Sequence, residues 1–244
     1  MKKLIFILSI SFCLKTFGQD SLFTQANNKY SKGSYEAAIS LYDSILSSGL
    51  ESSELFYNLG NCYYKQQDWA NAIWHYEKSL KLNSKNKNAS HNLQITQLKI
   101  IDQIESIPQL FYQKWWQNII SSLRTNTWQI LAIFCIWGIL IIQLLKRLKN
   151  YNTKYLLSLL ISLTVILFCI TYYSYQENYT KTEAIIFSSA VVVNSAPTDN
   201  STNLFSLHSG TKVEVIEHIG NWINITLSNG NSGWIKESEC KILN

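Results

Sequence analysis

The fold of the N-terminal half is decided by one stretch of sequence, Glu54-Leu-Phe-Tyr-Asn-Leu-Gly-Asn-Cys-Tyr-Tyr-Lys-Gln-Gln-Asp-Trp-Ala-Asn-Ala-Ile-Trp-His-Tyr-Glu-Lys-Ser-Leu80. Its residue types recur at a spacing of 34 positions. The matching pairs are Asn27 and Asn61, Tyr30 and Tyr64, Ala38 and Ala72, Ile39 and Ile73, Tyr42 and Tyr76, and Leu46 and Leu80. A repeat of this length predicts stacked units of two antiparallel helices, in which each unit packs only against its neighbours.

The residue types within each unit have a packing role. Ala38 and Ala72 are small, as are Ala26 and Gly60, and we expect all four where two helices cross, because larger side chains would hold the helices apart. Aromatic residues are expected to fill the gaps between the helices. Gly33 ends the first helix of unit one, and Gln67 takes that place in unit two.

This stretch closely resembles the tetratricopeptide repeat (TPR) consensus, with one unit at 19–52 and a second at 53–86. A third helix is expected from roughly Asn88 to Glu105, with Ile101 and Ile104 on or near its apolar face. Repeat stacks need their last apolar face covered, so we interpret this helix as a cap. A degenerate third repeat is the alternative. Residues 19–106 are therefore predicted to form an all-α domain.

The resemblance also implies a binding groove, because the first helix of each TPR unit lines a concave face that holds peptides or partner helices. Asn side chains both donate and accept hydrogen bonds, and Tyr side chains give broad contact at low entropic cost. The alternative is that these residues are consensus positions without a ligand. The candidate protein-binding residues are Asn27, Tyr30, Tyr57, Asn58, Asn61, Tyr64 and Lys65, with Phe23, His91 and Asn92 on the same face.

The carboxylate clamp found in some TPR domains is matched only in part. Asn27 and Asn61 stand at its two Asn positions, whereas Phe23, His91 and Ile95 stand where basic residues are expected.

The charge of the chain is not that of a nucleic-acid binder. The 244 residues carry a net charge of +5, and this excess is accounted for by Lys2 and Lys3 together with four basic residues between two apolar runs. A nucleic-acid binder would instead gather Lys and Arg on one folded face.

The first 18 residues read as an export signal. Lys2 and Lys3 precede an apolar run from Leu4 to Leu14, which is too short to span a bilayer but typical of a signal-peptide core. Thr16 and Gly18 are the small residues at the −3 and −1 positions of a cleavage after Gly18. An uncleaved N-terminal anchor is the alternative, and Phe12 before Cys13 argues against a lipoprotein signal.

Residues 107–175 predict a membrane hairpin preceded by an interfacial helix. The segment 107–125 is aromatic-rich, and its Trp115 and Trp116 are expected at the level of the lipid headgroups, with a buried soluble helix as the alternative. Two apolar runs follow, at 126–145 and 155–175, and each is long enough to cross a bilayer as a helix. Trp128 marks the interfacial end of the first.

The link between the two runs, residues 146–154, carries Lys146, Arg147, Lys149 and Lys154 and no acidic residue. The positive-inside rule places such a loop in the cytoplasm. Both flanking domains would then lie outside, in agreement with the export signal. We therefore expect a bacterial inner-membrane protein with two spans and two periplasmic domains.

Residues 181–244 change to short alternating segments separated by turns, which predicts a small all-β barrel. Strands are expected at 184–187, 190–193, 212–216, 222–226 and 233–235, with a tight turn at Asn229-Gly230. The markers Trp222 and Gly233-Trp234-Ile235 resemble the bacterial SH3 domain, whose members often bind cell-wall peptides. We expect both tryptophans in the core, and a surface position is the alternative. The family's leading motif appears here as Val191-Val-Val-Asn-Ser-Ala-Pro197, without its Arg and Gly.

No pattern in the sequence predicts catalysis, a metal or a cofactor. The five cysteines form no zinc spacing, and no His stands near a Cys or carboxylate in a ligand or nucleophile pattern. A Cys62 or Cys240 nucleophile is the enzymatic alternative, but no local motif supports it.

The order of segments over the whole chain resembles the BatE-type exported proteins of the Bacteroides aerotolerance (Bat) operon. The resemblance includes Ile107-Pro-Gln-Leu-Phe111 and Lys114-Trp-Trp116. It implies partners among other Bat membrane proteins, which bear von Willebrand type A domains, and a role in oxidative or envelope stress. We therefore expect a non-enzymatic membrane scaffold that binds proteins. A tether that binds peptidoglycan through the SH3-like domain is the alternative.

Overall fold

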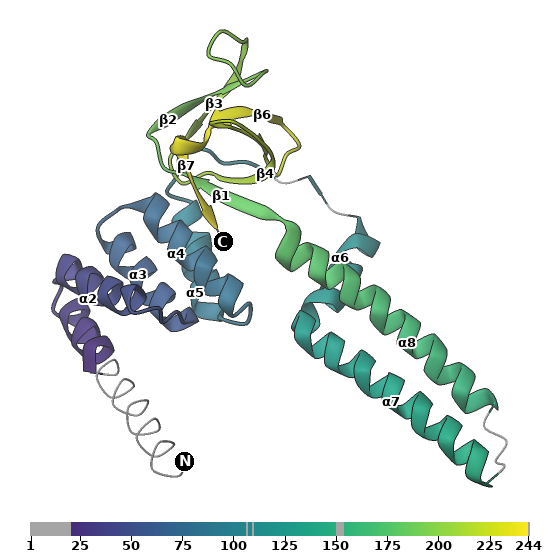
Figure 1. The fold of residues 1–244 in the computed structure, drawn as a ribbon. Coiled ribbons are helices and arrows are strands. Elements are labelled where there is room, and N and C mark those ends of the chain that lie inside the picture. The colour runs from purple at the N-terminus through teal and green to yellow at the C-terminus, as the bar shows by residue number, and fades with distance from the viewer. Residues whose placement is uncertain (1–20, 106, 109, 150–153, 244) are drawn as a thin grey trace. The chain divides into compact units, whose positions relative to one another are not determined.

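The computed structural model describes residues 21–105, 107–108, 110–149 and 154–243. It divides into two compact units. The globular unit comprises the chain up to Glu105 and again from Glu183, and the hairpin unit comprises Ser106–Thr182 (Figure 1). The predicted signal segment, residues 1–18, lies outside the described residues.

Five helices form the helical repeat of the globular unit. Residues 21–31 are followed by α2 (Tyr35–Ser47), α3 (Ser53–Lys65), α4 (Trp69–Leu82) and α5 (Lys87–Gln97). Side chains at the N-caps help to start three of them: Ser52, Asp68 and Asn86 accept hydrogen bonds from the backbone N–H groups of the first turns.

The repeat ends its first helices as the sequence predicts. Gly33 has a φ of +77° and Gln67 a φ of +63°, so both residues take the left-handed conformation that turns the chain into the next helix. Ala26, Ala38 and Ala72 are fully buried. A Cβ added to Gly60 would lie 2.6 Å from the Tyr76 ring. The small residues therefore stand where neighbouring helices come close, as expected.

The third helix is shorter than predicted. Helix α5 ends at Gln97, well before Glu105, and Gln103 donates hydrogen bonds to the freed carbonyls of Gln97 and Ile100. Ile104 packs against the core of the β domain instead of against the helices. The expectation that Ile101 and Ile104 lie on a helix face was wrong, because this segment binds the β domain.

The β domain is an antiparallel sheet of seven strands in the order β3-β2-β6-β5-β4-β1-β7 (Figure 1). Its core gathers the inward side chains Val191, Val193, Leu207, Val213, Val215, Ile223, Ile225 and Ile235. The strands are β1 (Thr182–Ile186), β2 (Ala190–Asn194), β3 (Asn203–His208), β4 (Lys212–Ile219), β5 (Trp222–Thr226), β6 (Ser232–Lys236) and β7 (Cys240–Leu243).

Two features of this domain differ from the expectation. Strands β3 and β7 were not predicted. Trp222 and Trp234 were expected in the core, but their neighbours Ile223 and Ile235 are the fully buried residues. Since side chains alternate along a strand, both tryptophans lie on the opposite face and stay partly exposed.

The helical repeat and the β domain share one hydrophobic cluster. Ile185 of β1 and Leu243 of β7 are buried together with Ile73, Trp74 and other side chains of the repeat. Gly210 lies at the same junction with a φ of +93°, and a Cβ there would come within 2.5 Å of Ile100. Part of the apolar surface of the repeat is therefore covered by the β domain.

Polar contacts reinforce this junction. The indole N–H of Trp74 donates to the carbonyl of Ile242 at 3.2 Å, and the Lys81 ammonium donates to the carbonyl of Leu243 at 2.8 Å. The Lys241 ammonium lies 3.8 Å from the centre of the Trp74 ring. Strand β7 is thus held against helix α4 by its backbone as well as by its side chains.

The hairpin unit consists of α6 (Phe111–Ser122), α7 (Thr125–Lys149), α8 (Lys154–Tyr175) and a short π-helix at Gln176–Thr180. Two of its helices are long and apolar enough to cross a membrane, Thr125–Leu148 and Lys154–Tyr175, each with a mean hydropathy of 2.2. Helices α7 and α8 lie side by side (Figure 1). Thr125 and Ser174 join their ends through a buried hydroxyl–hydroxyl hydrogen bond of 2.8 Å.

We expect Ile185→Ala to destabilise both parts of the globular unit, because it leaves a cavity in the cluster they share. Removing a large buried aliphatic side chain costs about 2–5 kcal/mol. Hydrogen exchange measured by mass spectrometry should show faster exchange in both α4 and β5. The control is Ile216→Ala on β4, whose side chain is 59% exposed. Faster exchange in β5 alone would contradict a shared core.

His75 makes the stability of the globular unit depend on pH. Its Nδ1 lies 2.8 Å from the carbonyl of Asn71, which can only accept, so Nδ1 carries the proton. Burial lowers the pKa of His75 to about 4. The unfolded chain takes up a second ring proton near pH 6.5 and the folded chain only near pH 4, so stability falls as the pH drops from about 6.5 to about 4.

At about 1.4 kcal/mol per pKa unit, this effect amounts to about 3 kcal/mol. The free energy of unfolding, measured with urea between pH 7 and pH 4, should therefore depend less on pH in His75→Phe than in the natural chain. A variant with the pH dependence of the natural chain would show that His75 is not the titrating group.

Candidate protein-binding groove

A hollow on the helical repeat brings together most of the residues that the sequence assigned to a groove. It has a volume of about 250 Å³. Its lining comes from the first helix of each repeat and from α5: Tyr30, Tyr57, Asn61, Tyr64, Lys65, Asn92 and Ile95. The hollow is thus built by residues that the 34-residue repeat places on one face.

A hydrogen-bonded ladder of Tyr and Asn side chains fixes the geometry of this face. The Tyr76 hydroxyl donates to Oδ1 of Asn61 at 2.7 Å, and Nδ2 of Asn92 donates to the same oxygen at 2.8 Å. The same three contacting positions occur one repeat earlier. There the Tyr42 hydroxyl donates to Oδ1 of Asn27 at 2.5 Å, and Nδ2 of Asn58 donates to it at 3.1 Å.

The ladder uses only half of each amide. The oxygens of Asn27 and Asn61 are occupied. Among the described residues, the amide nitrogens of these two side chains donate no side-chain hydrogen bond, and neither do the amide oxygens of Asn58 and Asn92 accept one. Donors and acceptors thus remain on side chains whose orientation is already fixed, as binding an extended backbone requires.

The groups behind the ladder stay uncharged. Burial raises the pKa of the Tyr42 and Tyr76 hydroxyls, which therefore remain hydrogen-bond donors at any physiological pH. Burial also raises the pKa of the Cys62 thiol to about 12, so this fully buried cysteine is not a reactive nucleophile. Lys65 is the charged residue of the lining and is exposed.

A second hollow of about 460 Å³ begins on the other side of Tyr57, which lines both. Phe23 and Asn58 contribute to it, together with Lys85 from the turn before α5 and Lys87, the first residue of α5. The concave face therefore offers a longer track than the first hollow alone, with basic residues toward both ends.

Five of the seven predicted groove residues line the first hollow: Tyr30, Tyr57, Asn61, Tyr64 and Lys65. Asn58 lines the second, and Asn27 supports the ladder. Asn92 stands 34 residues after Asn58, so the repeat spacing finds it. Ile95 was not assigned to the groove, although it stands 34 residues after Asn61 and the same spacing finds it.

The predicted membrane-interface tryptophans have different surroundings within the hairpin unit. Trp115 is 63% exposed. Trp116 packs edge-on against Tyr173 of α8, with ring centres 5.6 Å apart. The indole N–H of Trp128 donates to the carbonyl of Ile120 and so ties α7 to α6.

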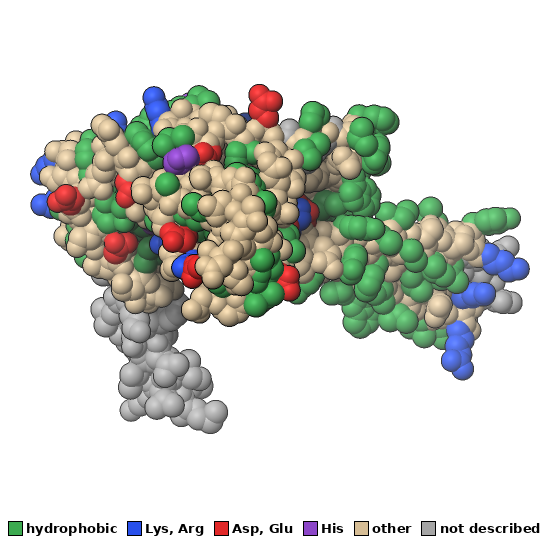
Figure 2. Space-filling view, turned by 90° about the horizontal axis from the view of Figure 1, so that it is seen from above, with side chains coloured by type: hydrophobic (Ala, Val, Ile, Leu, Met, Phe, Trp, Pro, Cys, Tyr) green, Lys and Arg blue, Asp and Glu red, His purple; other side chains and the backbone are tan. Residues whose placement is uncertain are grey.

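The basic loop lies at one end of the hairpin, where Lys and Arg side chains gather beyond the apolar surface (Figure 2). Lys146, Arg147 and Lys154 are exposed, and Lys149 is the last residue of α7. The remainder of the predicted loop, residues 150–153, lies outside the described residues.

In the described ranges of the chain, no group of three or more His, Cys, Asp or Glu side chains could hold a metal ion. Cys62, Cys135, Cys169 and Cys240 are free thiols.

Comparison with known families supports the two soluble domains. Residues 53–86 match the tetratricopeptide repeat, and residues 189–240 match the bacterial SH3 domain. No curated protein matches the chain. A helical repeat followed by an antiparallel sheet agrees with both matches. TPR domains suggest protein–protein interaction, bacterial SH3 domains suggest cell-wall binding, and both are typically non-catalytic.

We expect Tyr76→Phe to weaken the second helical repeat, because it removes a buried hydroxyl that holds Asn61. Losing one such hydrogen bond costs about 1 kcal/mol. Hydrogen exchange in α3 and α4 measures the loss. Tyr35→Phe is the matched control, since its hydroxyl makes no side-chain hydrogen bond among the described residues. Equal effects of the two substitutions would contradict a stabilising ladder.

Proposed function

We propose that this protein is a non-enzymatic scaffold of a bacterial inner membrane, whose helical repeat binds an extended segment of a partner protein. The observation that carries the proposal is the Tyr–Asn ladder beneath the hollow of the repeat. Hydrogen bonds within this ladder hold the amide groups of its Asn side chains oriented toward an open face. The match of residues 53–86 to the tetratricopeptide repeat supports the same function.

The chemistry of the groove suggests how a partner is held. The free amide groups of Asn61 and Asn92 can pair with the backbone of an extended peptide. Tyr30, Tyr57 and Tyr64 offer flat surfaces to its side chains. Phe23 and Ile95 stand where a carboxylate clamp would have basic residues, so we assign recognition to the peptide backbone.

The hairpin unit serves as the anchor in this proposal. The exposed apolar surfaces of α7 and α8 face lipid, and α6 lies at the membrane interface with Trp115 toward the headgroups. The basic end of the hairpin is cytoplasmic by the positive-inside rule. Two crossings then return the chain to the periplasm. Anchoring raises the effective concentration of the groove toward partners in the same membrane.

The partners that the segment order suggests are other Bat-type membrane proteins, in a complex linked to aerotolerance or envelope stress. This part of the proposal rests on the resemblance of the whole chain to BatE-type proteins. It adds no catalytic step, and no residue of the groove is assigned one.

Photocrosslinking in intact membranes tests the groove. A photoreactive residue replacing Tyr57 should give a discrete crosslinked membrane protein. Tyr64→Ala should reduce that product strongly, because it removes part of the groove wall. Lys32→Ala, an exposed change outside the hollow, should not. A photoreactive residue at Ser44 of α2 controls for random contacts. The same product from position 44, or none from position 57 in an inserted protein, would contradict the groove.

A second candidate function is a cell-wall tether through the β domain, which the bacterial SH3 match favours. The leading motif of that family is incomplete here, and its Asn194 is 8% exposed. Because Ile185 and Leu243 are buried against the helical repeat, the test uses the whole chain. Cosedimentation with purified cell wall that is lost in Trp222→Ala would favour the tether. Its absence would leave the groove as the binding site.

A further inference from the structure

The globular unit contains a further hollow, separate from the two on the groove face, which the proposed function does not use. It lies between the end of the helical repeat and the β domain and has a volume of about 550 Å³. One wall is α5 with the segment 98–104, and the other is formed by β1, β4 and β5. We name it the junction cleft. Its volume is in the range that binding sites for small ligands and peptide segments occupy.

The walls of the junction cleft are fixed relative to each other. Asp102 accepts hydrogen bonds from the backbone N–H of His208 at 2.6 Å and from the Thr211 hydroxyl at 2.6 Å, and it pairs with Nδ1 of His208 at 2.8 Å. Burial alone would raise the pKa of Asp102, but these hydrogen bonds lower it below its usual value. The carboxylate therefore stays charged and continues to hold both walls.

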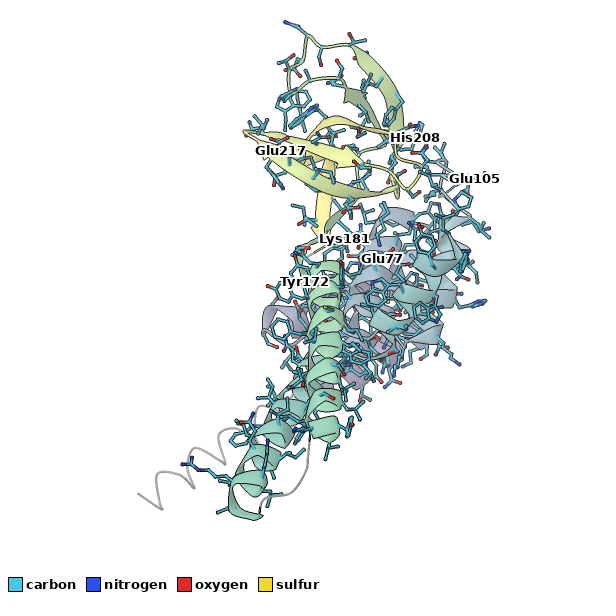
Figure 3. The ribbon with its side chains drawn as sticks, turned by 90° about the vertical axis from the view of Figure 1, so that its right-hand side faces the viewer. Glu77, Glu105, Tyr172, Lys181, His208 and Glu217 are labelled. Carbon is cyan, nitrogen blue, oxygen red and sulfur yellow. The ribbon has the colours of Figure 1, made fainter. Side chains whose placement is uncertain are left out.

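An ion pair beside the cleft also joins the two domains. The Lys212 ammonium lies 2.9 Å from the Glu77 carboxylate of α4 and 3.0 Å from that of Glu183 on β1. Glu77 and His208 mark the two sides of this junction (Figure 3). Because these contacts hold the two domains together, the cleft is already formed and a ligand would not have to open it.

Several polar groups in the cleft are not used by the fold. In the described part of the chain, Gln94, Glu214 and Ser228 make no side-chain hydrogen bond or ion pair. Leu98 lines the same hollow and is 73% exposed. An amide, a carboxylate and a hydroxyl beside an exposed aliphatic side chain are the groups that a short peptide segment can satisfy together.

The charge of the lining selects the sign of the ligand. The lining carries the carboxylates of Asp102, Glu183 and Glu214 and the ammonium group of Lys212. Asp102 is already bonded to His208 and Thr211, and Glu183 shares Lys212 with Glu77. Among the described residues, Glu214 is therefore the carboxylate of the lining that has no side-chain partner. Carboxylates grouped in a cleft attract cations.

We propose that the junction cleft binds a short basic segment of a partner protein. A Lys or Arg side chain of that segment pairs with Glu214, Gln94 and Ser228 bind its backbone, and Leu98 contacts an aliphatic side chain. The site is separate from the groove, so a scaffold with both would hold two segments at once.

The test uses the full chain in nanodiscs of zwitterionic lipid and measures fluorescence anisotropy with the labelled peptide Leu-Lys-Ala-Lys-Leu. We expect saturable binding that the matched peptide Leu-Glu-Ala-Glu-Leu does not show. Glu214→Lys should weaken binding at least about tenfold, since it places a like charge against the ligand. Glu217→Lys is the matched control, because Glu217 is exposed on the same strand, outside the cleft and away from His208 (Figure 3).

Four outcomes would overturn the proposal. The first is no binding to the natural chain, and the second is equal weakening by Glu214→Lys and Glu217→Lys, which would indicate only long-range attraction. The third is loss of binding in Tyr64→Ala, which would place the peptide in the groove. The fourth is equal affinity for spermidine, which carries ammonium groups without peptide amides. Failure of the groove itself would appear only in the photocrosslinking experiment, so the two proposals fail separately.

Discussion

The structure depends on one apolar contact, the burial of Ile185 and Leu243 of the β domain against Ile73 and Trp74 of the helical repeat. This contact joins two segments that the chain separates by the whole hairpin unit. Without it, an apolar surface of the repeat and the outer strand β7 would both be exposed, and the junction cleft would not exist. In the proposed membrane topology, the same contact requires both parts of the globular unit to lie on one side of the membrane.

Local sequence patterns predicted the helical repeat and most strands of the β domain. They did not predict the contacts that join the two. The 34-residue spacing placed the small residues at the helix crossings, and it identified Asn61 and Tyr64 as groove residues, because repeat periodicity is itself the record of helix packing. Strand β7 has four residues and no alternation to detect. Likewise, Ile101 and Ile104 continue a helical pattern of apolar residues. However, Asp102 between them is hydrogen-bonded to three groups of the β domain. Contacts between distant segments leave no periodic signal.

The polar contacts of the globular unit fall into two classes that suit two kinds of ligand. The ladder of the groove is built from neutral groups, Tyr hydroxyls and Asn amides, whose orientation is set by hydrogen bonds within the repeat. The junction cleft is lined in part by charged groups, and the Lys212–Glu77 ion pair and the hydrogen bonds of Asp102 join the two domains beside it. A neutral ladder favours contacts with any peptide backbone, whereas grouped carboxylates select by charge. The proposed scaffold could thereby distinguish its two proposed partners by their charge.

The most direct test of the account is the sidedness of single cysteines labelled with a membrane-impermeant maleimide. Cysteines replace Ser31 in the helical repeat, Asn200 in the β domain and Arg147 at the basic end of the hairpin, in a chain whose own cysteines are replaced. The shared core, together with the proposed membrane hairpin, predicts that positions 31 and 200 react from the same side of the membrane and position 147 from the other. Reaction of positions 31 and 200 from opposite sides would contradict it, because the two domains could not then share a core.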